Sequence, residues 1–127
     1  MVLVDSSVWI EYFKGNEKAK ILETLIDLNA VYINDLILAE LIPSIRHKKE
    51  KELDELISSI SRAPMGVNWQ SIINMQTLNL KNGINKVGIV DLIIIQNAID
   101  NDLELFSLDK HFELMSGLHK VKLFRTK

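Results

Sequence analysis

The chain has 127 residues and no cysteine, with 47% hydrophobic residues, 25% charged residues and a formal net charge of −2. These values predict a single globular domain, residues 1–127, that buries its own core. They exclude a disulfide scaffold, a cysteine nucleophile and a thiolate zinc site. The absence of cysteine fits a cytoplasmic protein, which we expect. The apolar runs are too short for a membrane-spanning helix or a signal peptide.

In chain order, short apolar strands alternate with helices. We predict strands at residues 2–4, 31–33, 104–107 and 121–124, and helices at residues 6–13, 17–28, 35–48, 51–60, 68–81, 91–101 and 110–115. Ser6 or Ser7 is expected to cap the first helix, and Asn34 or Asp35 the third. This alternation predicts an α/β fold with a parallel sheet covered on both faces, whose ligands bind beyond the carboxyl ends of the strands.

Four acidic residues lie at or inside apolar segments of this pattern: Asp5, Glu40, Asp91 and Asp109. Asp5 and Asp109 each follow a predicted strand, which places them at the edge of the sheet where ligands bind. Like charges gathered in one place repel each other. If the four acids converge, a positive group must lie among them, and a divalent metal ion is the natural candidate.

Each acid also has a structural interpretation. Asp5 and Asp109 stand where helix N-caps stand, and Asp91 could cap its own helix. Glu40 is harder to explain in this way, because it has apolar neighbours on both sides and carboxylates are rarely buried unless they are paired or coordinating. The three histidines have no partner at metal-ligand spacing, and we expect them on the surface or in packing contacts: His47, His111 and His119.

Basic residues are concentrated at 46–51 and in the tail, residues 110–127 up to Lys127. Such clusters are usually solvated surface, and the net charge argues mildly against simple electrostatic binding to nucleic acid. The alternative is a basic rim that binds a polyanion.

The segments that carry the four acids resemble, in order, those of PIN-domain ribonucleases of the VapC toxin type. They are residues 2–13 with Asp5, 35–41 with Glu40, 88–94 with Asp91 and 105–112 with Asp109. Any one of these motifs is weak, but four in register over one small domain are specific. Ser107 stands where the family more often has threonine, and residues 95–98 replace a run that is more often small and apolar, which leaves the role of Gln96 and Asn97 open.

The resemblance implies a three-layer α/β/α sandwich with a central parallel sheet, and metal-dependent endonucleolytic cleavage of RNA. It also implies a toxin that a cognate antitoxin holds inactive and that commonly forms a homodimer. Asp5 and Asp91 would bind Mg²⁺ or Mn²⁺ directly, and Asp109 would complete the coordination directly or through water. Glu40 would orient or deprotonate the attacking water, while Ser6 and Ser107 could hold the carboxylates in place.

A phosphoryl-transfer domain on a similar sheet is one rival to this interpretation. A haloacid-dehalogenase phosphatase needs Asp-x-Asp after its first strand, and the chain has Asp5-Ser6-Ser7 there. A response-regulator receiver needs an acidic pair near the first strand, which is also absent. The remaining alternative is a catalytically inactive PIN-like module that binds RNA or protein, and the presence of all four acids argues against it.

Overall fold

The sheet is parallel throughout and has four strands in the order β3-β2-β1-β4. In the computed structural model, which describes residues 1–125, the strands are β1 (Val2–Val4), β2 (Val31–Ile33), β3 (Ser61–Arg62) and β4 (Glu104–Phe106). Lys127, which the sequence groups with the basic tail, lies outside the described residues. Val2, Leu3 and Val4 are all buried, as expected for a central strand that is covered on both faces.

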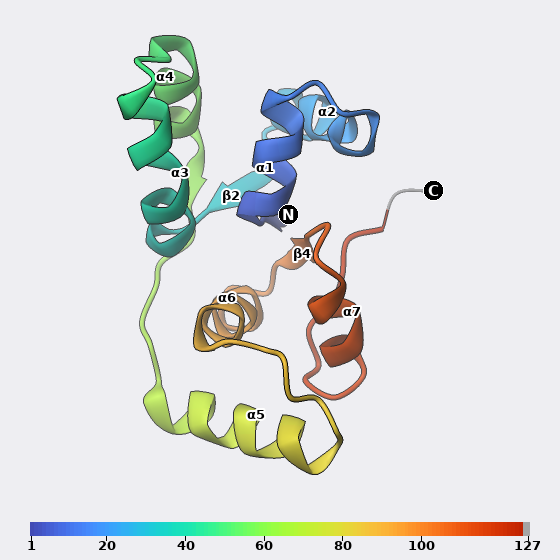
Figure 1. Ribbon diagram of the computed structural model, residues 1–127. Coiled ribbons are helices and arrows are strands. Elements are labelled where there is room, and N and C mark those ends of the chain that lie inside the picture. The colour runs from blue at the N-terminus through green and yellow to red at the C-terminus, as the bar shows by residue number, and fades with distance from the viewer. Residues whose placement is uncertain (126–127) are drawn as a thin grey trace.

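The helices form a layer on each side of this sheet (Figure 1). They are α1 (Ser6–Phe13), the short 3₁₀ helix η1 (Glu17–Ala19), α2 (Ile21–Asp27), α3 (Asp35–His47), α4 (Lys51–Ser59), α5 (Trp69–Lys81), α6 (Ile89–Asp100) and α7 (Lys110–Ser116). Helices α1 and α2, with the α3–α4 pair beside them, lie on one side. Helices α6 and α7 lie on the other, with α5 packed against α6. The predicted α/β/α sandwich is therefore confirmed. No helix within residues 1–125 is both long and apolar enough to cross a membrane.

Several predicted boundaries differ from the structure for local reasons. The helix predicted at 17–28 is divided, because the side chain of Asn16 accepts a hydrogen bond from the backbone N–H of Lys18 at 3.0 Å and closes a tight 3₁₀ turn first. The helix predicted from Asp91 begins two residues earlier, with Gly88 at the N-cap. Strand β3 was not predicted, because both of its residues are exposed and carry no apolar pattern.

The strand predicted at 121–124 is wrong in extent. It forms a single parallel bridge, in which the N–H and C=O of Leu105 bond to Lys122 and Phe124, each at 2.8 Å. Backbone groups of successive strand residues point to opposite sides, and β4 is only three residues long with β1 on one side. Only the middle residue, Leu105, therefore turns its N–H and C=O to the side away from β1.

A chain of buried amides joins the two sides of the sandwich. Asn34 is fully buried and caps α3, accepting a hydrogen bond from the N–H of Ile37 at 2.9 Å. Its Nδ2 donates to Oδ1 of Asn97 at 2.9 Å, and Nδ2 of Asn97 donates to the carbonyl of Pro64 at 2.9 Å. Gln96 accepts from the N–H of Asn68 at 3.3 Å. The Gln96–Asn97 pair, whose role the sequence left open, thus connects α6 to α3 and to the segment before α5.

We expect Asn97→Ala to lower the free energy of unfolding by about 1–3 kcal/mol, because it leaves the buried Asn34 amide without its acceptor. Urea unfolding measures this change. Asn74→Ala, on the exposed face of α5, is the matched control and should change stability by less than about 0.5 kcal/mol. Equal stability of the two variants would contradict a structural role for the amide chain.

Candidate active site

Two adjacent strands bring the first and last acids together. β1 and β4 pair in parallel with Val4 opposite Phe106, and the N–H of Asp5 continues the ladder by bonding to the carbonyl of Phe106 at 2.9 Å. Asp5 and Ser107 are therefore neighbours at the carboxyl edge of the sheet, although 102 positions separate them along the chain.

Asp5 is buried, with 6% of its surface exposed, and one carboxylate oxygen is held by two serines. Its Oδ2 accepts hydrogen bonds from the hydroxyls of Ser7 at 2.8 Å and Ser107 at 2.9 Å. Asp5 occupies the N-cap position of α1, but its side chain caps no N–H of the helix, so the expected cap from Ser6 or Ser7 is also wrong. The carboxylate is therefore oriented by hydroxyl groups and not by the helix.

The same two hydroxyls fix the loop after β4. The oxygen of Ser7 accepts from the N–H of Leu108 at 3.1 Å, and the oxygen of Ser107 accepts from the N–H of Asp109 at 3.0 Å. Each serine thus bonds both to the Asp5 carboxylate and to the backbone that leads to Asp109. Sequence reasoning named Ser107 but missed Ser7; a hydroxyl two residues after a strand-ending aspartate is the signal that could have identified it.

Glu40 approaches from α3 and differs from expectation in being exposed to solvent. Desolvation raises its pKa above the ordinary value of 4.5, the Asp5 carboxylate raises it further, and Asp91 adds a smaller effect in the same direction. A hydrogen bond from Ser6 opposes these effects. Ser6 therefore acts on Glu40, whereas Ser7 is the residue that bonds to Asp5.

Asp91 lies in the first turn of α6 and its side chain is 22% exposed. Its pKa is raised above 3.8 by desolvation first, then by the negative charge of Asp109, with a smaller contribution from Asp5. The backbone of Gly88 and the imidazole of His111 act in the opposite direction. Asp91 is therefore not the N-cap of its helix, since Gly88 holds that position, and its charge faces the other acids.

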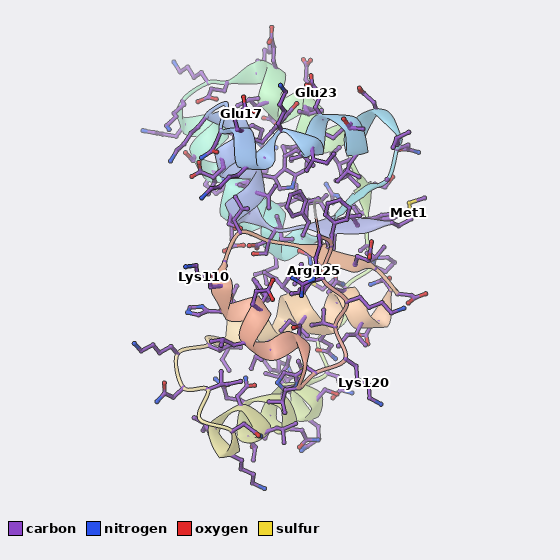
Figure 2. All side chains as sticks on the ribbon, turned by 90° about the vertical axis from the view of Figure 1, so that its right-hand side faces the viewer. Met1, Glu17, Glu23, Lys110, Lys120 and Arg125 are labelled. Carbon is purple, nitrogen blue, oxygen red and sulfur yellow. The ribbon has the colours of Figure 1, made fainter. Side chains whose placement is uncertain are left out.

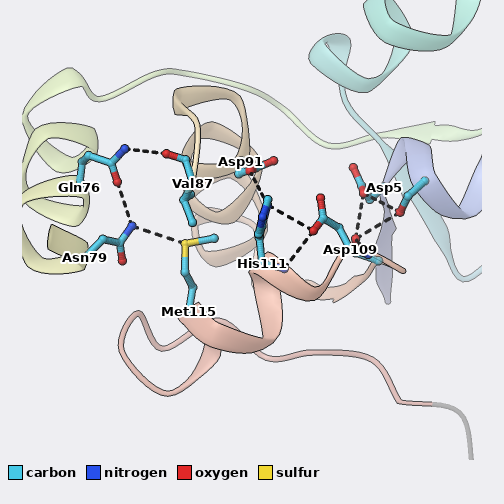
Figure 3. Close-up of polar contacts among 10 residues, drawn as sticks. Asp5, Gln76, Asn79, Val87, Asp91, Asp109, His111 and Met115 are labelled. Atoms are coloured by element: carbon cyan, nitrogen blue, oxygen red, sulfur yellow. Dashed lines mark hydrogen bonds and ion pairs between the residues drawn. The ribbon is translucent and has the colours of Figure 1, made fainter. Parts of the chain in front are cut away.

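Asp109 both caps α7 and lies among the acidic side chains of the site. Its Oδ1 caps α7 by accepting from the backbone N–H of His111 at 2.9 Å, and the ring Nδ1 of His111 lies 3.3 Å from the same oxygen. That ring nitrogen is also 3.7 Å from Oδ2 of Asp91. His111, which the sequence analysis assigned to the surface or to packing, is thus a direct neighbour of two of the four acids (Figure 3).

The donor set suits a hard divalent cation, because carboxylate oxygens without thiolates favour Mg²⁺ or Mn²⁺ over zinc. Asp5, Glu40, Asp91 and Asp109 come from four elements, and the charges of the neighbouring acids act on Glu40 and Asp91, which indicates negative potential at one edge of the sheet. As the side chains are placed in residues 1–125, no three Asp, Glu or His groups already surround a common point at metal-binding distance. Binding an ion therefore requires the carboxylates to turn toward one another.

A groove of about 300 Å³ borders the site beside Glu40, between α1 and the α3–α4 pair. Its walls combine apolar side chains such as Ile10 and Phe13 with the ammonium groups of Lys14 and Lys48. Glu40 lines this groove together with these apolar and basic side chains.

The basic clusters are only partly available to bind phosphates. Arg46 pairs with Asp54 at 3.1 Å, and Arg125 makes a two-pronged contact with Glu113 at 2.8 and 3.3 Å. Lys110, Lys120 and Arg125 lie apart on the surface and do not form one patch (Figure 2).

We expect Ser7→Ala to lower the free energy of unfolding by about 1–3 kcal/mol, because it removes a donor from buried Asp5 and an acceptor from the N–H of Leu108. Ser6→Ala, one position earlier on the same helix, should cost less than about 1 kcal/mol, since Ser6 bonds to the exposed Glu40. Urea unfolding of both variants compares them. Equal losses of unfolding free energy in the two variants would show that the Ser7–Asp5 hydrogen bond stabilises the fold no more than the Ser6–Glu40 contact does.

The raised pKa of Glu40 gives a pH-dependent prediction. The folded state binds the proton of the Glu40 carboxyl more tightly than the unfolded state does. The free energy of unfolding therefore falls as the pH rises from the ordinary pKa of 4.5 through the folded pKa, and this loss is absent below 4.5. In EDTA, Glu40→Gln should melt at a higher temperature than the unsubstituted protein at about pH 7, and at the same temperature at about pH 4. Glu55→Gln, an exposed residue of α4, is the control. A lower melting temperature for Glu40→Gln at neutral pH would contradict the coupling.

Comparison with known proteins identifies the family of the chain and solved structures with a similar fold. A model of the PIN domain family matches residues 2–118. VapBC2 from Rickettsia felis, solved bound to a DNA fragment from its promoter, has a TM-score of 0.76 at 18% identity and covers 100% of both chains. FitAcB from Neisseria gonorrhoeae has a TM-score of 0.71 at 18% identity, covering 98% of this chain and 97% of the matched one.

A toxin–antitoxin complex from Klebsiella pneumoniae has a TM-score of 0.65 at 20% identity and covers 95% of each chain. At these identities the likeness shows the fold alone. A search of curated protein sequences finds no significant match. Because the family model spans nearly the whole chain, the protein belongs to the PIN domain family.

Proposed function

We propose that the protein is a metal-dependent endoribonuclease of the VapC toxin type that cleaves RNA phosphodiester bonds at the four-acid site. The observation that carries this proposal is that Ser107 bonds both to Asp5 and to the backbone of Asp109, while one ring of His111 lies within 3.3 Å of Asp109 and 3.7 Å of Asp91. Desolvation and, after it, the neighbouring carboxylates raise the pKa values of Glu40 and Asp91. A fold gains nothing in stability from such mutual repulsion. Membership of the PIN family and the presence of all four acids support a nuclease.

Asp5 and Asp91 would hold Mg²⁺ or Mn²⁺, with Asp109 completing the set directly or through water. The ion would supply positive charge for the scissile phosphate and acidify a water molecule. Ser7 and Ser107 keep Asp5 oriented, and since both hydroxyl protons are donated to Asp5, neither is available to the substrate. The raised pKa of Glu40 makes its carboxylate a better proton acceptor, which suits it to orient or deprotonate the attacking water.

A cognate antitoxin, a homodimer and a cytoplasmic location belong to the same proposal. The solved neighbours from Rickettsia felis and Klebsiella pneumoniae are named as VapBC2 and as a toxin–antitoxin complex, which supports an antitoxin partner. One face of α5 leaves Trp69, Ile73 and Leu80 about 60% exposed, at spacings of four and seven residues. Large apolar side chains exposed along one helix face mark an interface, which supports a dimer. An RNA substrate implies the cytoplasm.

The decisive experiment is RNA cleavage by purified, antitoxin-free protein with Mg²⁺ or Mn²⁺. We expect cleavage to be lost in EDTA and in Asp5→Asn and Asp91→Asn, each of which removes a charge expected to hold the ion while the fold remains, as circular dichroism checks. Asp100→Asn, the same substitution at an exposed position of α6, the helix that carries Asp91, should retain full activity. If either site variant cleaves at the unsubstituted rate in saturating Mg²⁺, the assignment is wrong.

Asp109→Asn separates the two roles of Asp109. Asparagine caps helices as well as aspartate does, so the variant should keep the melting temperature of the unsubstituted protein while its cleavage rate falls at least about tenfold. Loss of melting temperature with unchanged cleavage would assign Asp109 to capping alone. If folded, ion-bound protein cuts no RNA from total cellular RNA, the inactive binding module becomes the better description.

A further inference from the structure

His111 occupies a position that the four-acid site does not account for. It lies in the first turn of α7, and Figure 3 shows its ring between Asp91 and Asp109. Its Nδ1 is 3.3 Å from Oδ1 of Asp109 and 3.7 Å from Oδ2 of Asp91. The ring therefore brings a nitrogen next to two carboxylates that come from different helices.

This nitrogen is shielded from solvent and makes no hydrogen bond. Although two carboxylate oxygens are close, neither accepts from it, and the atom has no hydrogen-bond partner among residues 1–125. Buried polar atoms in native proteins nearly always have a partner. The backbone N–H of His111 is satisfied by Asp109, so the group without a hydrogen bond is the ring Nδ1, on a side chain that is otherwise 38% exposed. A nitrogen that lies at ion-pair distance from two carboxylate oxygens but bonds to neither is an arrangement that a bound cation would complete.

The distances are compatible with ligands of one ion. An ion coordinated octahedrally at about 2.1 Å separates neighbouring ligands by roughly 3.0 Å. The nitrogen-to-oxygen distances of 3.3 and 3.7 Å are only slightly longer. Since no three groups yet surround a common point, an ion would draw the ring and the carboxylates inward.

We propose that His111 is a nitrogen ligand of the divalent ion, on the Asp91–Asp109 side of the site, and that it biases the protein toward Mn²⁺ over Mg²⁺. Mg²⁺ prefers oxygen ligands and retains its waters, whereas imidazole nitrogen suits transition-metal ions. The inference rests on the proposed function, because it requires an ion at the four-acid site. It adds a ligand from a helix position two residues beyond Asp109.

Pulsed electron paramagnetic resonance of the Mn²⁺ complex tests this directly, because a coordinated imidazole gives a ¹⁴N coupling. Full-length protein is first stripped with EDTA, and titration calorimetry gives the affinities for Mn²⁺ and, by competition, for Mg²⁺. We expect a ¹⁴N coupling in the unsubstituted protein that disappears in His111→Ala. The Mn²⁺ affinity of that variant should fall by about 10- to 100-fold, with a smaller change for Mg²⁺.

Two further variants control for folding and for the loss of any histidine. His111→Asn retains a polar group of similar reach and should bind Mn²⁺ without the ¹⁴N coupling. His47→Ala, at the exposed end of α3, should keep both the coupling and the ratio of the two affinities.

The outcomes separate this inference from the proposed function. If Mn²⁺ binds and Asp5→Asn abolishes binding, but no ¹⁴N coupling is seen and the affinity ratio in His111→Ala is unchanged, the ligand role of His111 is wrong while the nuclease proposal stands. If the unsubstituted protein binds neither ion, both are overturned.

Discussion

The buried carboxylate of Asp5 is the point on which the rest of the site depends. It ends the central strand, and a buried charge must be paired or hydrogen-bonded to be tolerated. Two hydroxyls meet this need from opposite ends of the chain, Ser7 at the start of α1 and Ser107 after β4. Because the same hydroxyls also bind the backbone of the loop that leads to Asp109, the position of the last acid depends on the first.

The other two acids are placed by helices that a second polar connection holds together. Glu40 lies six residues after Asn34 on α3, and Asn97 lies six residues after Asp91 on α6. The buried hydrogen bond between Asn34 and Asn97 therefore ties the two helices that carry Glu40 and Asp91. Amides buried in an apolar core must find specific partners, so they fix one relative position of the helices where apolar packing alone would allow several.

Desolvation, and after it the nearby carboxylates, raise the pKa values of Glu40 and Asp91, but within residues 1–125 the acids do not enclose a common point. Asp109 is partly engaged in capping α7, and His111 stands between it and Asp91. This arrangement keeps like charges apart in the protein alone, and a divalent cation would reverse the balance by attracting all of them. If the proposed function is right, these anchored acids would reach their final geometry only when the ion binds.

The sequence by itself determined the alternation of strands and helices, the parallel sheet and the positions of the four acids, because hydrophobic periodicity and strand-end residues are local signals. It also identified Asn34 as a candidate cap. It missed β3 and overestimated the strand at 121–124, since pairing at a sheet edge depends on which backbone groups a neighbouring strand leaves free.

Only the tertiary structure decided which polar side chains contact the four acids. Ser6 and Ser7 are equivalent in sequence, but the turn of α1 directs Ser7 to Asp5 and Ser6 to Glu40. His111 has no partner at metal-ligand spacing along the chain, yet in the folded protein its ring lies 3.7 Å from Asp91. Likewise, the Gln96–Asn97 pair acquires its role only when α3 and the segment before α5 are in place. Contacts between residues far apart in the chain leave no local pattern, because the hydrogen bonds and charges that select them exist only after folding.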